Sequence, residues 1–339
     1  MKIFALVLSV LALNLSFFQP AFAADEMDKA AKEDYVDIGG GQRLWASYKA
    51  PKNGAPTVVL LHGLTYTMKP WNYFADDLVK LNPDVGVLRY DMTGMGKTLL
   101  GGPLPVNYEI TYQNQVRQLR ALLEIYKIEK PTLVGLSYGG AIALAYAATY
   151  PGTFDKLILM APFTEPLESQ DKFIRTQISA TRIAFPFNPS TDAQLYDFFL
   201  RQFVYTTFPL SEPVTVANPY ILEAVYQMTR SVRFFHASAI VDQLPPNSVH
   251  LMVGGQDQYI PREVLDRFWN SLPEATRASR TNIAYTEHKI PEAAPTYSAS
   301  WVNEIIKGNK LLSGGRVFEG NPWTFKARSG ETEIAVPRP

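Results

Sequence analysis

One serine in this sequence lies where a strand-like run meets a helix-like run, with glycines on both sides. Ser137 stands in the stretch LVGLSYGGAIALAY, between Gly135 and Gly139. The spacing is G-x-S-x-G, which in a strand–turn–helix context is typical of a nucleophile held on a sharp turn where larger neighbours would collide. The alternative interpretation of Ser137 is a helix N-cap, since serine side chains also accept hydrogen bonds from a first helical turn.

A serine hydroxyl attacks a carbonyl only when a base takes its proton. The sequence has four histidines that qualify by type. His62 and His288 each follow a strand-like run, so both are expected at the carboxyl edge of a parallel sheet, where such loops meet. His236 and His250 are predicted to be packing or surface residues.

A histidine base needs a carboxylate that fixes its tautomer and stabilises the imidazolium. Asp257 follows the apolar stretch VHLMVGG, in a loop expected at the same edge. The chain order Ser137, Asp257, His288 is the order expected for such a triad. Asp257 also qualifies as the N-cap of the next helix, and the two roles are compatible. Glu165, just after another strand-like run, is the rival acid.

The stretch DMTGMGKT, residues 91–98, offers a competing interpretation as a phosphate-binding loop. Its last three residues, Gly96, Lys97 and Thr98, match the end of that motif. The motif requires glycine where Asp91 stands, so the nest of backbone donors would be incomplete. Nucleotide binding is therefore disfavoured.

The elements that must position these residues alternate between strands and helices. Apolar runs such as TVVLLHG, residues 57–63, indicate strands buried on both faces. The order predicts an α/β fold, a mostly parallel doubly wound sheet of about eight strands with helices on both faces. Strands are predicted at residues 35–37, 44–48, 57–63, 85–91, 131–137, 156–162, 249–257 and 282–286, and helices at 71–81, 108–126, 138–150, 262–270 and 297–307.

One interval, residues 164–246, breaks the alternation with helical stripes and prolines but no clear buried strand. We expect a helical cap inserted over the carboxyl edge of the sheet, with 24–163 and 247–310 forming the core. Most of its large rings are expected to pack against the core, and Phe199 and Phe203 are candidates for substrate contact, as are Tyr66 and Trp71 near His62. The pattern does not assign the C-terminal tail, residues 311–339.

Composition excludes several classes of function. Lys+Arg and Asp+Glu number 32 each, so no field favours nucleic acid or an anionic membrane surface. The chain has no cysteine, which excludes disulfides, thiol catalysis and Cys-ligated metal. Neither a metal nor an organic cofactor is expected, and the sequence leaves the oligomeric state open.

The first residues are typical of an export signal. Lys2 precedes an almost wholly apolar run over residues 3–18, and Ala21-Phe22-Ala23 fits the small-x-small cleavage rule. We predict cleavage after Ala23, so residues 1–23 are a signal peptide and the mature protein is periplasmic or secreted, with no membrane span left. The alternative is an uncleaved anchor, for which the apolar run is short.

From about residue 36 to residue 307 the chain resembles the α/β-hydrolase superfamily, in its serine-nucleophile branch with an inserted cap. The resemblance rests on the joint order of HGLTYT, RYDMTGMGKT, GLSYGG, GGQDQYIP and EHKIPEAAP. There are two departures. Glu287 stands where many members have a small residue, and only His62-Gly63 remains of the HGGG form of the oxyanion loop.

The resemblance implies an oxyanion hole made by the backbone N–H groups of Leu64 and Tyr138. One such donor typically lowers the barrier by about 3 kcal/mol. It also implies that His62 shapes this loop rather than acting as the base, and that Asp91 makes a structural hydrogen bond.

These observations predict an exported serine hydrolase, most simply a carboxylic-ester hydrolase for small-molecule or lipid-like esters with an apolar acyl or aryl group. Ser137, Asp257 and His288 would act through an acyl-enzyme. Amide or peptide hydrolysis and carbon–carbon bond hydrolysis remain alternatives with the same triad. A catalytically inactive ligand-binding protein is the alternative from another class.

Overall fold

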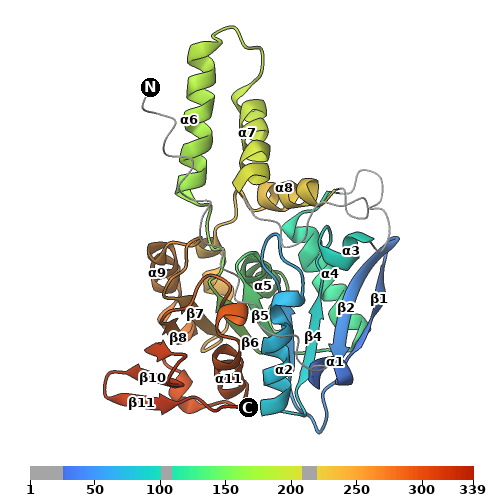
Figure 1. The fold of residues 1–339 in the computed structure, drawn as a ribbon, viewed down its shortest axis with the longest axis vertical. Helices are drawn as coiled ribbons and strands as arrows, with labels where there is room; N and C mark the ends of the chain where they lie inside the picture. The colour runs from blue at the N-terminus through green and yellow to red at the C-terminus, as the bar shows by residue number, and fades with distance from the viewer. Residues whose placement is uncertain (1–25, 101–108, 208–219) are drawn as a thin grey trace.

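The computed structural model describes residues 26–100, 109–207 and 220–339, and the predicted signal peptide, residues 1–23, lies outside them. Its framework is one sheet of eleven strands, drawn in Figure 1. They are β1 (Lys32–Gly39), β2 (Gln42–Lys49), β3 (Thr57–Leu61), β4 (Gly86–Tyr90), β5 (Thr132–Leu136), β6 (Lys156–Met160), β7 (Val249–Gly254), β8 (Arg277–Ile283), β9 (Arg316–Asn321), β10 (Lys326–Ser329) and β11 (Thr332–Ala335).

The order across the sheet is β1-β2-β4-β3-β5-β6-β7-β8-β9-β10-β11. Neighbours from β4 to β9 are parallel, whereas β1, β2, β10 and β11 pair antiparallel at the two ends. Parallel neighbours end at the same edge of the sheet, so the loops after β3, β5, β7 and β8 come together there.

Helices cover both faces of the sheet, as the doubly wound prediction requires. One hydrophobic core packs helices α4 (Tyr112–Ile125), α5 (Tyr138–Thr149) and α9 (Arg262–Ser271) against the sheet. The other core packs α2 (Asn72–Leu81) and α11 (Pro295–Ile306) on the opposite face (Figure 1). Strands β3, β4, β5 and β7 are buried along their whole length because both faces are covered.

Between β6 and β7 the chain leaves the sheet, in the interval where a helical insertion was expected. It forms α6 (Glu168–Ala184), α7 (Asp192–Thr207) and α8 (Ile221–Ser231). Figure 1 shows α6 and α7 side by side, projecting from the body as a long hairpin, with α8 at its base. The remaining short helices are α1 (Glu26–Ala30), α3 (Gly96–Leu100) and α10 (Ile290–Ala293). Within the described ranges no helix has the length and apolar character needed to cross a bilayer.

The C-terminal tail, which the sequence pattern left unassigned, continues the sheet. β9 pairs in parallel with β8. Phe318 on β9 is fully buried and packs edge-on against Trp301, with 5.4 Å between the ring centroids. The sheet therefore has eleven strands rather than about eight and extends past the predicted core limit at residue 310. These strands are short and half-buried, so their apolar signal is weak in the sequence.

The strand predicted at residues 282–286 instead spans Arg277–Ile283, a polar sequence that is nevertheless almost wholly buried. Its polar groups pair with those of its neighbours. Arg280 forms an ion pair with Asp266 at 2.5 Å, and Asn282 donates to Glu319 of β9 at 2.6 Å. Burial of Arg280 and Asn282 is tolerated because each finds a partner, and hydrophobic patterning cannot reveal such pairs.

Candidate active site

Ser137 occupies the turn between β5 and α5 in a backbone conformation that few residues other than glycine adopt, with φ 52° and ψ −116°. Backbone hydrogen bonds hold it there. The Ser137 amide donates to the Met160 carbonyl at 3.0 Å, and its carbonyl accepts from the amides of Gly140 and Phe163 at 2.9 Å each. The strained turn is thus stabilised by neighbouring loops at the carboxyl edge.

Gly135 and Gly139 are required because other backbone atoms fill the space where side chains would lie. A Cβ on Gly139 would stand 2.2 Å from the carbonyl oxygen of Leu61. A Cβ on Gly135 would stand 2.5 Å from the carbonyl oxygen of Gly139. Neither oxygen can move aside, since both belong to buried elements.

Replacing Gly139 with alanine should therefore destabilise the fold by about 3 kcal/mol, the range in which overpacking of a tight core lies. The measurement is the free energy of unfolding in urea. The matched control is Gly308→Ala, where φ is 74° but no atom lies within 4 Å of the added methyl group. It measures backbone strain alone and should cost about 1 kcal/mol. Equal losses in the two variants would contradict the steric explanation.

His288 and Asp257 form a hydrogen-bonded pair at the ends of neighbouring strands. The imidazole Nδ1 lies 2.8 Å from Asp257 Oδ2, and both side chains are only 4% exposed. The other carboxylate oxygen accepts from the amides of Tyr259 at 2.8 Å and Ile260 at 2.9 Å. These two amides orient the carboxylate. Because Nδ1 is engaged, Nε2 is the ring atom left for proton exchange.

The loop that carries His288 lies against the end of β7, and Gly254 makes this approach possible. A Cβ on Gly254 would stand 2.7 Å from the carbonyl oxygens of Thr286 and Glu287. The ring of Tyr259 packs edge-on against His288 at 5.2 Å between centroids. The side chain of Glu287, the departure from the family pattern, belongs to an exposed residue.

Ser137 and His288 line the same cavity, of about 220 Å³, at the carboxyl edge of the sheet. The structure therefore brings Ser137 and the Asp257–His288 pair to one site. The walls come from the core loops and from α6, α7 and α8. The lining comprises Leu64, Thr65, Tyr66, Ser137, Tyr138, Phe163, Pro166, Leu167, Ser169, Gln170, Asp171, Tyr196, Phe203, Thr229, Val232, Arg233, Gln258, Tyr259, Ile260 and His288.

The two predicted oxyanion donors belong to residues of this lining. Leu64 follows Gly63, where an added Cβ would stand 3.3 Å from Ser137 Cβ, so this loop runs directly beside the serine. Tyr138 is the first residue of α5 and directly follows Ser137 in the chain. Both residues thus line the part of the cavity next to Ser137.

His62 shapes the loop before Leu64. Its Nε2 accepts from the Met92 amide at 2.9 Å, and its Nδ1 lies 2.8 Å from the Gly63 carbonyl oxygen. A neutral ring with its proton on Nδ1 satisfies both bonds, and complete burial lowers the pKa of His62 to about 4. The ring ties the strand-end loops together, which is the structural role that the resemblance implied.

Asp91 also makes structural hydrogen bonds. Its two carboxylate oxygens accept from the amides of Met68 and Lys97, each at 2.8 Å. A Cβ on Gly96 would stand 2.2 Å from one of these oxygens. This crowding accounts for the glycine at position 96, so no phosphate ligand is needed to explain it. The amide of Lys97, which a phosphate loop would offer to its ligand, is already engaged.

The other histidines lie away from the cavity. His236 is exposed, whereas His250 is buried on β7 with its Nδ1 2.8 Å from Ser279 Oγ. Burial, with a smaller contribution from the charge of Lys156, lowers the pKa of His250 to about 3. The rival acid Glu165 forms an ion pair with Arg267 instead of contacting a histidine.

The buried rings of His62 and His250 should make stability depend on pH. Their pKa values in the folded chain, about 4 and about 3, lie below the ordinary value of 6.5, so the unfolded chain binds more protons below that value. The free energy of unfolding should fall on acidification from pH about 6.5 to about 4, by roughly 1.4 kcal/mol per pH unit for each ring. Urea unfolding at several pH values measures this slope. His250→Leu should remove about half of it, and an unchanged slope would contradict the assignment.

Two of the predicted substrate contacts lie outside the cavity lining. Trp71 is fully buried in the core under α2, with its ring edge-on to Phe74 at 5.2 Å. Phe199 packs against the core from α7, perpendicular to the ring of Phe198. Both predictions rested on proximity in sequence or on a helical stripe, and neither sets which way a side chain points. Tyr66 and Phe203, by contrast, line the cavity.

Sequence reasoning missed most of the cavity lining, including the polar residues Arg233 and Tyr259. Tyr259 stands two residues after Asp257, in a stretch that the sequence analysis had already assigned to the site. Its place in the cavity could therefore have been predicted. No sequence signal marked Arg233. Its guanidinium lies over the ring of Tyr196 at 3.5 Å, a contact between α7 and the segment after α8 that only the folded chain creates.

A family model described as the alpha/beta hydrolase fold matches residues 56–288. The chain belongs to this hydrolase family. It is 32% identical over 127 residues to a putative 2-succinyl-6-hydroxy-2,4-cyclohexadiene-1-carboxylate synthase of Bacillus subtilis, covering 37% of this chain and 42% of that protein. It is 33% identical over 138 residues to a 2-hydroxy-6-oxononadienedioate/2-hydroxy-6-oxononatrienedioate hydrolase of Paraburkholderia phymatum, covering 39% of this chain and 45% of that protein. The chain thus spans less than half the length of these two relatives.

Solved structures confirm the alpha/beta hydrolase fold. The 2-hydroxy-6-oxo-6-phenylhexa-2,4-dienoate hydrolase from Rhodococcus sp. strain RHA1 matches with a TM-score of 0.60 and 21% identity, over 82% of this chain and 99% of that one. Esterases and lipases are also among the structural neighbours. At such identities the likeness establishes the fold alone.

Proposed function

We propose that this alpha/beta hydrolase is a serine hydrolase that cleaves a carboxylic ester. The observation that carries the proposal is the meeting of a strained serine turn and a carboxylate-oriented histidine at one cavity. Each feature alone has a structural explanation. Their convergence at one site is what nucleophilic catalysis by serine requires.

In this proposal His288 Nε2 takes the proton of Ser137 as Oγ attacks the ester carbonyl. Asp257 stabilises the imidazolium that forms, through the bond to Nδ1. The amides of Leu64 and Tyr138 donate to the tetrahedral oxyanion, and each contributes about 3 kcal/mol. His288 then protonates the departing alcohol, which leaves an acyl-enzyme. A water deprotonated by His288 releases the acid.

The cavity favours an apolar acyl or aryl group on the substrate. Much of its lining is apolar, including Leu64, Phe163, Leu167, Val232 and Ile260. Such walls bind by excluding water, while a few polar groups orient the reacting bond. This is the same class of ester that the sequence predicted.

Export belongs to the proposal as well and rests on residues 1–23 alone. We expect the mature protein in the periplasm or the medium, starting at Ala24. N-terminal sequencing of the protein from a native-like host checks this, and an intact Met1 would overturn it.

Carbon–carbon bond hydrolysis is the second candidate. Two of the similar proteins are named as hydrolases of oxo-dienoates, which carry carboxylates. Arg233 places one guanidinium in the lining of the cavity, where a carboxylate could pair with it. This reaction would use the same serine and histidine, so only the substrate separates the two candidates.

A fluorophosphonate label and a substrate panel test the proposal. The label should attach covalently to Ser137 in the wild type and fail to attach in Ser137→Ala. A series of p-nitrophenyl esters of rising acyl length should be hydrolysed faster than the matching amides and a 2-hydroxy-6-oxo-dienoate. Faster turnover of the dienoate would favour the second candidate, and absence of labelling in folded protein would overturn both.

A further inference from the structure

The far end of the α6–α7 hairpin exposes large apolar side chains to solvent. The sequence IAFPF, residues 183–187, covers the last two residues of α6 and the start of the turn to α7. Ile183 is 83% exposed, Phe185 66% and Phe187 95%. Three such residues together at one projecting end are unusual for a surface in water and mark an interaction site.

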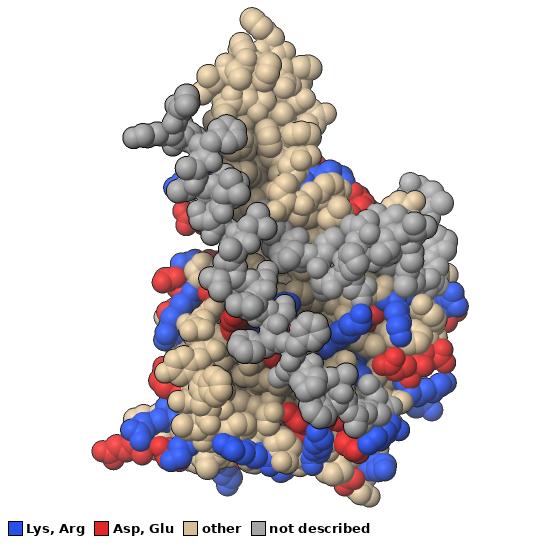
Figure 2. All heavy atoms as spheres, in the orientation of Figure 1, with Lys and Arg blue, Asp and Glu red and all other residues tan. Residues whose placement is uncertain are grey.

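This end of the hairpin is also almost free of charge. Between residues 176 and 194 the charged residues are Arg182 and Asp192, and they form an ion pair at 2.7 Å. Figure 2 shows the visible face of the projecting end without acidic or basic side chains, whereas the body below carries many of both signs. The tip therefore presents a neutral apolar surface.

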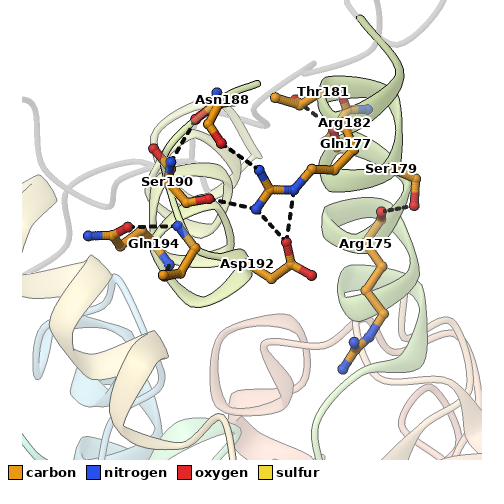
Figure 3. Close-up of polar contacts among 10 residues, drawn as sticks. Arg175, Gln177, Ser179, Thr181, Arg182, Asn188, Ser190, Asp192 and Gln194 are labelled. Carbon is orange, nitrogen blue, oxygen red and sulfur yellow. Dashed lines mark hydrogen bonds and ion pairs between the residues drawn. The ribbon is translucent and has the colours of Figure 1, made fainter. Parts of the chain in front are cut away.

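Several backbone polar groups of the turn are bonded within the hairpin (Figure 3). The Arg182 guanidinium donates to the carbonyl oxygens of Asn188 at 3.1 Å and Ser190 at 2.6 Å. The amides of Phe185 and Asn188 are bonded to the preceding turn at 2.8 and 3.0 Å. Backbone groups that enter lipid must be satisfied internally, and these bonds meet part of that requirement before any contact.

The base of the same hairpin forms part of the candidate active site. Ser169, Gln170 and Asp171 of α6 and Tyr196 and Phe203 of α7 line the cavity. Asp171 in the cavity wall and Ile183 at the tip are twelve residues apart along α6, which places the tip about 18 Å from the cavity wall. The hairpin is a continuous structural connection between the cavity and the exposed apolar turn.

We propose that the tip of the α6–α7 hairpin, residues 183–187, inserts into the surface of a zwitterionic lipid bilayer and holds the cavity near that surface. A protein partner fits less well, because a stable interface buries about 800 Å² on each side and a convex turn offers much less. Insertion into a lipid surface requires only that apolar side chains reach about 5–10 Å deep. The paired charges at the tip remove any need for anionic lipid.

Cosedimentation with phosphatidylcholine vesicles tests the proposal on the mature chain. The double variant Phe185→Ser, Phe187→Ser should lower the partition coefficient at least about tenfold, since two rings no longer leave water. The matched control is Trp323→Ser, a ring that is 75% exposed in the turn between β9 and β10, at the other end of the molecule (Figure 1). It should bind within about twofold of the wild type.

A second variant reports insertion directly. Phe187→Trp should show a blue shift of tryptophan emission when vesicles are added, and brominated lipids should quench it. Ser137→Ala should bind vesicles as the wild type does, because docking does not use the hydroxyl. Loss of ester turnover and loss of docking are therefore separable results.

Four results would overturn the proposal. The first two are no vesicle binding by the wild type and equal binding by the double variant. The third is binding that requires anionic lipid and disappears at high salt. The fourth is a wild type that is a dimer and a double variant that is a monomer, without vesicle binding by either. Circular dichroism and turnover of a water-soluble ester establish that each variant is folded. The measurement of ester turnover rests on the proposed function, whereas the measurement of vesicle binding does not.

Discussion

Replacing Ser137 with alanine should lower kcat/KM for a p-nitrophenyl ester by about 10⁴- to 10⁶-fold, as loss of a serine nucleophile does in other hydrolases. The change removes one oxygen and leaves the backbone bonds of the turn to Met160, Gly140 and Phe163 in place. The thermal unfolding midpoint should therefore stay close to that of the wild type. Steady-state kinetics and a thermal melt on the same preparation measure both quantities.

The matched control is Ser169→Ala, which removes the hydroxyl of another serine in the cavity lining. Ser169 lies on α6 in ordinary helical backbone, without the strained turn that presents Ser137. Its turnover should remain within about twofold of the wild type, the usual range away from the reacting groups. Comparable losses in the two variants, or normal turnover in folded Ser137→Ala, would end the nucleophile assignment.

The second large effect is expected from Asp257→Asn, which should lower kcat about 10⁴-fold with a small change in KM. The asparagine oxygen can still accept from the amides of Tyr259 and Ile260, so the loop should keep its shape. Its NH₂ group would then face His288 Nδ1 as a donor and force the ring proton onto Nε2. In that tautomer the imidazole cannot take the serine proton.

Glu165→Gln is the control for this prediction. Glu165 was the rival acid in the sequence, and in the structure it pairs with Arg267 on α9. Turnover of this variant should stay within about twofold of the wild type, because an exposed ion pair contributes little. If Glu165→Gln lost activity and Asp257→Asn kept it, the acid of the triad would have been misassigned.

The sequence by itself was sufficient for the features that depend on local pattern. Apolar runs identified the buried strands, and the ends of those strands placed Ser137, His62, Asp257 and His288 at one edge. Parallel strands share a carboxyl edge, so residues far apart in the chain could be brought together by topology alone. The glycines around Ser137 were informative for a similar reason, because crowding at the turn depends on its immediate neighbours.

Other features became visible only in the folded chain. β8 to β11 carry polar or alternating residues, and what makes β8 a strand is the pairing of Arg280 and Asn282 with partners from α9 and β9. Such pairs join residues without a shared pattern. The length of the sheet beyond residue 310 therefore depended on tertiary contacts.

The helical insertion also has features that the sequence showed and features that only the folded chain decided. Its helical stripes were apparent in the sequence, but whether a ring on a stripe meets the cavity depends on how each helix is rotated and where it leaves the body. That is why Phe203 lines the cavity while Phe199 packs away from it, and why the position of Arg233 could not be anticipated. It is also why residues 183–187, an ordinary apolar pentapeptide in sequence, become an exposed tip far from the core. Side-chain direction is a property of packed elements, and the sequence determines it only through the whole fold.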